Sequence, residues 1–69
     1  MTTYNIITIG QDYTNDDEMT YRKISSKYNI SLKKIHDDFH NKLRFENPFL
    51  YEKVCYKIFI NKHPSIKVK

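Results

Sequence analysis

The chain has 69 residues and a formal net charge of +4, with twelve Lys and Arg against eight Asp and Glu. A chain of this length has room for one domain, residues 1–69, whose small core would gain stability from dimerisation or a partner. Its one cysteine, Cys55, excludes an internal disulfide and a cysteine-based zinc site. No apolar run is long enough to span a membrane and no signal peptide is visible, so we expect a cytoplasmic protein without membrane contact.

The charge is unevenly distributed along the chain. Residues 1–20 carry four acidic residues and no Lys or Arg, whereas residues 21–69 carry all twelve basic residues and four acidic ones. A basic body is typical of proteins that bind nucleic acid, although a solvated Lys-rich surface accounts for it equally well. The frequent use of Lys, Asn, Ile and Tyr suggests an A/T-rich genome, such as that of a phage, a plasmid or a host bacterium.

The N-terminal part predicts a strand followed by a helix. Residues 4–9 are rich in β-branched and aromatic side chains and are followed by Gly10, which predicts a strand over 4–9. Asn15 and Glu18 have the spacing of a capping box, which predicts a first helix at about residues 16–28.

A second helix is predicted at about residues 32–45, with Ser31 as its N-cap. Its apolar stripe recurs at steps of three and four residues: Leu32, Ile35, Phe39 and Leu43. Its outer face pairs opposite charges at i,i+4 spacing: Lys33 with Asp37, and Lys34 with Asp38.

Beyond Asn47 the pattern supports two structures. Asn47 and Pro48 are typical of a helix start, and we favour a third helix over residues 48–60. The alternation from Val54 to Ile60 also fits a β-hairpin, whose Lys-rich arms would resemble a wing on the phosphate backbone. Residues 66–69 alternate and predict a short C-terminal strand. The side chains expected in the core of the protein include Phe39, Phe45, Phe59 and the Cys55 thiol.

The segment 23–43 has a small residue at the expected helix crossing, a turn residue and flanking apolar positions. These residues are Ile24, Ser25, Tyr28, Asn29, Ile30, Ser31, Ile35, Asp38 and Phe39. In this pattern the segment resembles the bihelical unit of winged helix-turn-helix regulators, including the deoxyribonucleoside-type repressors. The resemblance implies a small α+β fold with a helix-turn-helix core, although a strand is expected where such regulators carry a preceding helix.

The resemblance also implies a DNA-binding surface on the two helices. The second helix would enter the major groove of double-stranded DNA. Its assigned residues are Ser31, Lys33 and Lys34 at the helix start, and His36 and Asp37 further along. Backbone phosphates would be contacted from the first helix by Arg22, Lys23 and Lys27. The short reading helix and marginal core favour a homodimer.

We find no pattern that indicates catalysis. His36 and His40, four residues apart, are interpreted as surface imidazoles rather than metal ligands, and no phosphate loop or nucleophilic triad is present. We therefore expect a non-enzyme without cofactor or metal, acting as a small DNA-binding transcriptional regulator. The alternative is a small phage or mobile-element protein that binds and inhibits a host protein; single-stranded RNA binding through aromatic stacking comes third.

Overall fold

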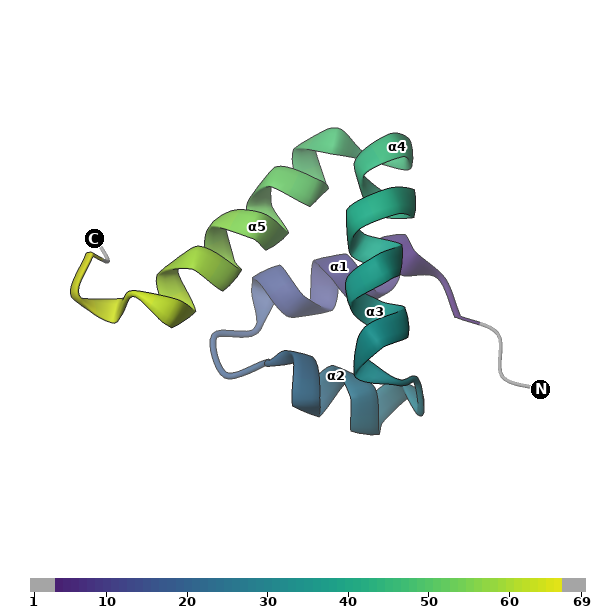
Figure 1. Ribbon diagram of the computed structural model, residues 1–69, viewed down its shortest axis with the longest axis horizontal. Helices are drawn as coiled ribbons and strands as arrows, with labels where there is room; N and C mark the ends of the chain where they lie inside the picture. Colours follow the sequence, from purple (N-terminus) through teal and green to yellow (C-terminus); the bar gives the residue numbers. More distant parts are fainter. Residues whose placement is uncertain (1–3, 67–69) are drawn as a thin grey trace.

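The structure, a computed structural model, describes residues 4–66 and shows helices but no strand among them (Figure 1). The expected α+β class is therefore wrong, and this part of the chain is all-α. The elements in chain order are α1 (Ile6–Asn15), α2 (Tyr21–Tyr28), α3 (Leu32–Asp38), η1 (Phe39–Leu43), α4 (Arg44–Glu46), α5 (Pro48–Lys62) and η2 (Pro64–Ile66). No helix of the described part is long and apolar enough to cross a bilayer.

Helix α1 replaces the strand predicted over residues 4–9. Asn5 caps it, its side-chain oxygen accepting a hydrogen bond of 2.8 Å from the Ile7 N–H. The buried positions of α1 follow the helical period: Ile6, Ile9, Gly10 and Tyr13. Burial of this face outweighs the β preference of its isoleucines, because tertiary packing supplies most of the stability of a short helix.

The first predicted helix, expected at about residues 16–28, corresponds to α2 and begins only at Tyr21. Asn15 ends α1 instead of opening a new helix, and the Asp16 carboxylate accepts a hydrogen bond of 2.9 Å from the Glu18 N–H in the linking turn. Thr20 is the true N-cap of α2, accepting from the Lys23 N–H at 3.2 Å. The capping-box prediction failed because Asn15 is the last residue of α1 and therefore has a helical backbone, whereas an N-cap needs an extended one.

The second predicted helix is confirmed, with one irregular turn. Helix α3 continues through η1, a π-helical turn, into α4. A π turn rotates the residues that follow it relative to a continuous α-helix. Ile35, Phe39 and Leu43 are buried as predicted, whereas Leu32 at the first helical position is 44% exposed. Phe45, expected in the core, lies after the π turn and is 88% exposed.

Residues 48–62 form helix α5, which confirms the helical alternative and excludes the hairpin and its wing. Asn47 caps it, accepting a hydrogen bond of 3.1 Å from the Leu50 N–H. Only Leu50 and Val54 of α5 are buried, so Phe59 and Cys55 are exposed rather than internal as expected. The predicted C-terminal strand falls mostly on residues 67–69, outside the described part, and its first residue ends η2.

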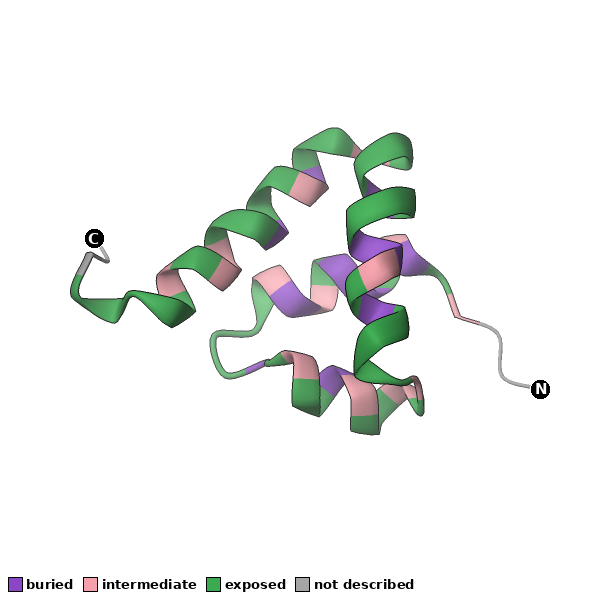
Figure 2. Ribbon diagram, viewed as in Figure 1, coloured by how far each residue is buried: buried purple, intermediate pink, exposed green. Residues whose placement is uncertain are grey.

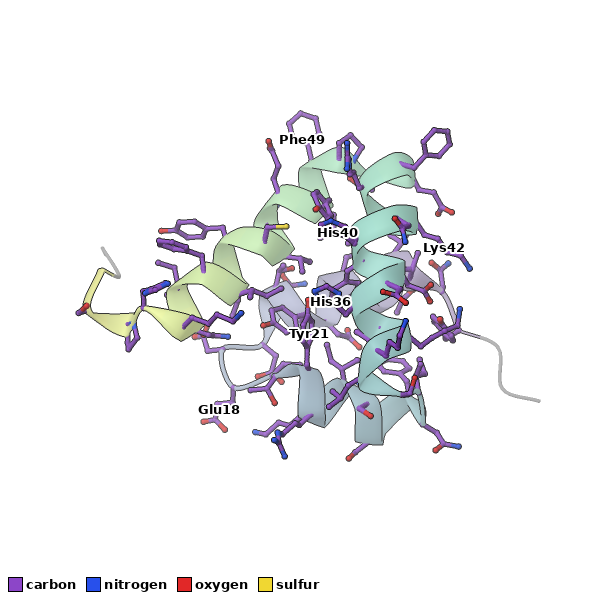
Figure 3. The ribbon with its side chains drawn as sticks, in the orientation of Figure 1. Glu18, Tyr21, His36, His40, Lys42 and Phe49 are labelled. Carbon is purple, nitrogen blue, oxygen red and sulfur yellow. The ribbon has the colours of Figure 1, made fainter. Side chains whose placement is uncertain are left out.

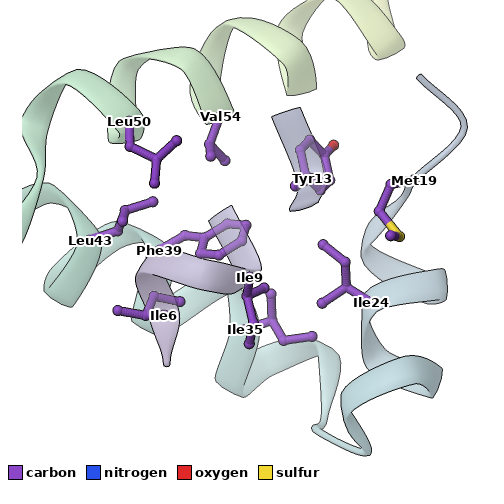
Figure 4. Packing of buried hydrophobic residues seen from close by; sticks show 10 residues of the cluster. All are labelled: Ile6, Ile9, Tyr13, Met19, Ile24, Ile35, Phe39, Leu43, Leu50 and Val54. Atoms are coloured by element: carbon purple, nitrogen blue, oxygen red, sulfur yellow. The ribbon is translucent and has the colours of Figure 1, made fainter. Parts of the chain in front are cut away.

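The core forms where α1 meets the other helices (Figure 4). It contains ten buried apolar residues: Ile6, Ile9, Tyr13, Met19, Ile24, Ile35, Phe39, Leu43, Leu50 and Val54. Figure 2 shows the buried stretches of α5 on the side that faces α1, while the outer side of α5 is exposed along its length. The Lys57 ammonium ties α5 to the end of α1, donating to the carbonyl oxygens of Thr14 at 3.3 Å and Asp16 at 2.8 Å.

Candidate nucleic-acid interface

The turn between α2 and α3 is built around Asn29. Its backbone is left-handed, with φ of 55° and ψ of 50°, as the sequence predicts for a residue that ends a helix. The N–H groups of Asn29 and Ile30 both donate to the Ser25 carbonyl. Ser31 then caps α3, its hydroxyl accepting a hydrogen bond of 3.2 Å from the Lys34 N–H. These bonds fix the angle at which α3 leaves α2.

The crossing of α2 and α3 is closed by small and apolar side chains. Ile24 and Ile35 are fully buried between the helices. The Ser25 hydroxyl donates to the Ile30 carbonyl and so uses its polar group within the turn. The turn and the crossing thus have the cap, small and buried residues that the sequence pattern predicts: Ile24, Ser25, Asn29, Ser31 and Ile35. We refer to residues 20–46 as the α2–α3 unit.

Asp38 is a structural residue rather than part of an exposed reading face. It is the one buried charged residue of the described chain. Its carboxylate accepts hydrogen bonds from the Tyr4 hydroxyl and from the Lys34 ammonium, the latter at 3.3 Å. Lys34 is therefore committed to a buried partner, which makes it a poorer DNA ligand than the sequence suggests. Asp37, in contrast, lies half exposed on α3.

The outward side of α3 carries Lys33 and Asp37, which form an exposed ion pair of 3.0 Å. Beside them the rings of His36 and His40 stack with centroids 5.9 Å apart and planes 13° apart. Figure 3 shows both imidazoles on the side of α3 that faces α5, near Tyr21, whereas Lys42 points to the opposite side. The two histidines are surface groups, as the sequence predicts.

The three cations predicted on α2 have different surroundings. Lys27 forms a 3.0 Å ion pair with Asp12 of α1, which also accepts a hydrogen bond from the Tyr28 hydroxyl. These two contacts, Tyr28 first, lower the pKa of Asp12, and the same carboxylate raises the pKa of Lys27. Lys23 lies 3.8 Å from Glu18, and Arg22 is exposed without an ion pair in the described part.

Two residues that the sequence analysis did not select extend the outward side of α3. Asn41 and Arg44 are exposed on the same continuous helix. Asn and Arg are residue types that read adenine and guanine in the major groove. Continuing the i,i+4 pattern of Lys33 and Asp37 beyond the first two turns would have found Asn41.

The α2–α3 unit as a whole keeps an excess of positive charge. Its seven basic residues are Arg22, Lys23, Lys27, Lys33, Lys34, Lys42 and Arg44, against the three acids Asp37, Asp38 and Glu46. Exposed ion pairs contribute at most about 1 kcal/mol each. The exposed lysines can therefore exchange their carboxylate partners for phosphate groups at little cost.

A shallow apolar cavity of about 210 Å³ adjoins this surface between α3 and α5. The Tyr51 hydroxyl lies 3.1 Å from His40 Nδ1 at its edge, and a hydrogen bond with the Cys55 thiol raises the pKa of Tyr51. Burial among the same side chains raises the pKa of Tyr21. Among residues 4–66 no group of three or more His, Cys, Asp or Glu is placed to hold a metal ion.

No protein-family model, no curated protein and no solved structure matches this chain. A functional assignment therefore depends on the geometry and charge of the α2–α3 unit.

Proposed function

We propose that this chain is a small DNA-binding regulator of the helix-turn-helix type, with α3 as its recognition helix. The proposal is supported by α1, which supplies the helix that regulators of this type carry before the bihelical unit. The fixed turn at Asn29 and the buried crossing of Ile24 and Ile35 support it further, because they hold α3 with its polar side outward.

Each surface residue has a defined role in this proposal. The continuous helix formed by α3, η1 and α4 enters the major groove with Lys33, Asn41 and Arg44. Arg22, Lys23 and Lys27 contact backbone phosphates from α2. Ser31 and Lys34 act on the helix itself, since the first caps α3 and the second pairs with buried Asp38. The observation that carries the proposal is the excess of cations on the α2–α3 unit, whose turn is fixed by hydrogen bonds and whose crossing is buried.

The first prediction concerns Lys33. We expect the protein to bind a labelled duplex of about 20 base pairs with an affinity that falls steeply between about 50 and 200 mM salt. Binding releases the salt cations condensed on the DNA phosphates, and this release becomes less favourable as the salt concentration rises. Lys33→Gln should weaken binding and reduce the log–log salt slope by about one contact. Lys62→Gln, the same charge change on the far end of α5, is the matched control. Fluorescence anisotropy measures both quantities.

Neutralising Asp37 should act in the opposite direction. Asp37→Asn removes a carboxylate from the outward side of α3 and releases Lys33 from its ion pair, so binding should tighten at low salt. Glu52→Gln changes the net charge equally on exposed α5 and serves as control. Equal effects of the two members of either pair would show that net charge alone governs binding. Absence of binding at micromolar protein in low salt would contradict the proposal outright.

A further inference from the structure

A groove runs between α1 and α5 on the side of the molecule away from α3. It consists of two adjoining hollows of about 310 and 290 Å³ that share Thr14 and Lys53. Its wall on the α5 side is formed by Phe49, Lys53, Tyr56 and Ile60, and Asp17 lies at its other end. We refer to this feature as the α1–α5 groove.

Helix α5 has a second apolar stripe that the core does not use. Phe49 is 79% exposed, and Tyr56, two turns further along, is 60% exposed. A spacing of seven residues puts both rings on one side of the helix. The buried residues Leu50 and Val54 lie on another side, so α5 is apolar on two faces. Figure 2 shows the outer face of α5 exposed, and Figure 3 shows Phe49 pointing outward from it.

We propose that this stripe and the α1–α5 groove form a homodimer interface in which the α5 helices of two copies pack antiparallel. Phe49 and Tyr56 project from α5 and also line the groove beside it. In a dimer with a two-fold axis, the rings of each copy therefore lie in the α1–α5 groove of the other copy. The same surface carries both the protruding rings and the groove that receives them, so it is self-complementary, as a two-fold interface requires.

The charges of the groove fit the same arrangement. Lys53 lies where the two hollows join, whereas Asp17 lies toward the C-terminal end of α5, near Lys57 at 3.5 Å. The Asp17 side chain is 96% exposed, so its carboxylate is free to take a second partner. Antiparallel packing about a two-fold axis at the level of Cys55 and Tyr56 brings Lys53 of each copy to Asp17 of the other, because Asp17 lies beside Lys57. Two equivalent ion pairs then form. A parallel arrangement would instead oppose Lys53 to Lys53.

The aromatic stripe supplies part of the area that a dimer needs. An aromatic side chain buries about 150–250 Å². Phe49 and Tyr56, which are 79% and 60% exposed, together offer roughly 200–350 Å² for each copy. A stable interface buries about 800 Å² on each partner, and a helix of 15 residues with the adjacent α1 surface can supply the remainder.

This interface does not depend on DNA binding. None of the described residues of α2 or α3 lines the groove. Either proposal can therefore fail while the other stands, and assembly is measured without nucleic acid.

The mass of the full chain in solution is the first measurement. Sedimentation equilibrium should give twice the chain mass of 8.4 kDa at micromolar to submillimolar protein. Phe49→Ser should weaken dimerisation by about tenfold or more, as expected for an aromatic anchor. Phe45→Ser is the matched control, because Phe45 is 88% exposed but lies outside the groove. A monomeric wild type over this range, or equal weakening by both variants, would overturn the proposal.

Charge reversal tests the antiparallel pairing directly. Lys53→Glu opposes two acids across the interface and Asp17→Lys opposes two lysines, so each variant alone should dimerise more weakly. A mixture of the two variants restores both attractive pairs and should form a heterodimer of near wild-type affinity. Failure of the mixture to recover, with both variants folded by circular dichroism, would overturn the arrangement.

Discussion

Asn29 sets the geometry of the candidate interface through its own backbone. It is the one non-glycine residue of the described chain with a positive φ. The left-handed region costs most residues about 1–2 kcal/mol, and Asn tolerates it better than most. The Ser25 carbonyl, which accepts from the N–H groups of Asn29 and Ile30, holds that conformation in place. A single residue thus determines which side of α3 is exposed.

The carboxylate of Asp12 forms a pH-dependent contact with Lys27 and Tyr28. Its pKa is lowered by the Tyr28 hydroxyl and the Lys27 ammonium. A carboxyl with a lowered folded-state pKa stabilises the protein above its unfolded pKa of about 4, and loses that contribution as the pH falls through the folded value. This contact joins α1 to α2, so acid should loosen the helix that supports the α2–α3 unit.

We therefore predict that Asp12→Asn lowers the free energy of unfolding at neutral pH, and that the gap to wild type closes below about pH 4. Urea denaturation at a series of pH values measures this difference. Tyr28→Phe removes the largest contribution to the lowered pKa and should reproduce most of the gap. A gap that is the same at pH 3 as at pH 7 would contradict the assignment.

Among the elements, α1 is placed by a close approach at Gly10. A Cβ atom at this position would lie 3.1 Å from the Cδ2 atoms of Leu43 and Leu50. Glycine therefore lets α1 pack against η1 and α5 at once, although it costs about 1 kcal/mol of helix propensity relative to Ala.

Substitution of Gly10 should consequently destabilise the fold. Gly10→Ala gains helix propensity but forces two buried leucines to move, and overpacking of this kind costs about 1–3 kcal/mol. We expect a net loss of about 1 kcal/mol for Gly10→Ala and a larger loss for Gly10→Val, measured by urea denaturation. Gln11→Ala, on the exposed side of the same helix, should be close to neutral. If Gly10→Ala instead stabilised the fold, Leu43 and Leu50 could move aside at little cost, and the prediction would be contradicted.

Elements whose signals are local could be predicted from the sequence, and those set by packing could not. Ser31, the i,i+4 pairs of α3 and the start of α5 at Asn47 follow from capping and periodicity. Helix α1 could not be predicted, because its β-branched residues favour a strand locally and only the burial of Ile6, Ile9 and Tyr13 against the other helices favours a helix. The expected burial of Phe45 is wrong, because this residue lies two positions after buried Leu43 and therefore on the opposite side of the helix from the apolar stripe. For the candidate site, sequence indicated the cations but not the burial of Asp38.

On the scale of the whole molecule, the first and last long helices hold each other in place. Lys57 of α5 donates to two carbonyls at the end of α1, more than 40 residues earlier in the chain. The Thr14 carbonyl belongs to the last turn of α1, which has no intrahelical donor and forms the negative end of the helix dipole. The Asp16 carbonyl lies just beyond the helix and also accepts a hydrogen bond of 3.1 Å from the Met19 N–H. The Lys57 ammonium group thus stabilises the C-terminal end of α1, where the helix would otherwise fray.

Loss of this group should weaken the molecule as a unit. We expect Lys57→Ala to lower the free energy of unfolding by about 1.5–3 kcal/mol, the range for hydrogen bonds to charged groups. Lys62→Ala, one turn beyond on exposed helix, should change it by less than about 0.5 kcal/mol. Circular dichroism and tyrosine fluorescence should report one coincident transition in urea. Separate transitions would contradict the dependence of α1 on α5.

The order of synthesis gives the α1–α5 contact a further consequence. Helix α1 is translated before Leu50, Val54 and Lys57, the α5 residues that cover it. The apolar face of the nascent α1 therefore remains uncovered until α5 has left the ribosome. Native packing of α1 requires the chain to be synthesised at least as far as Lys57.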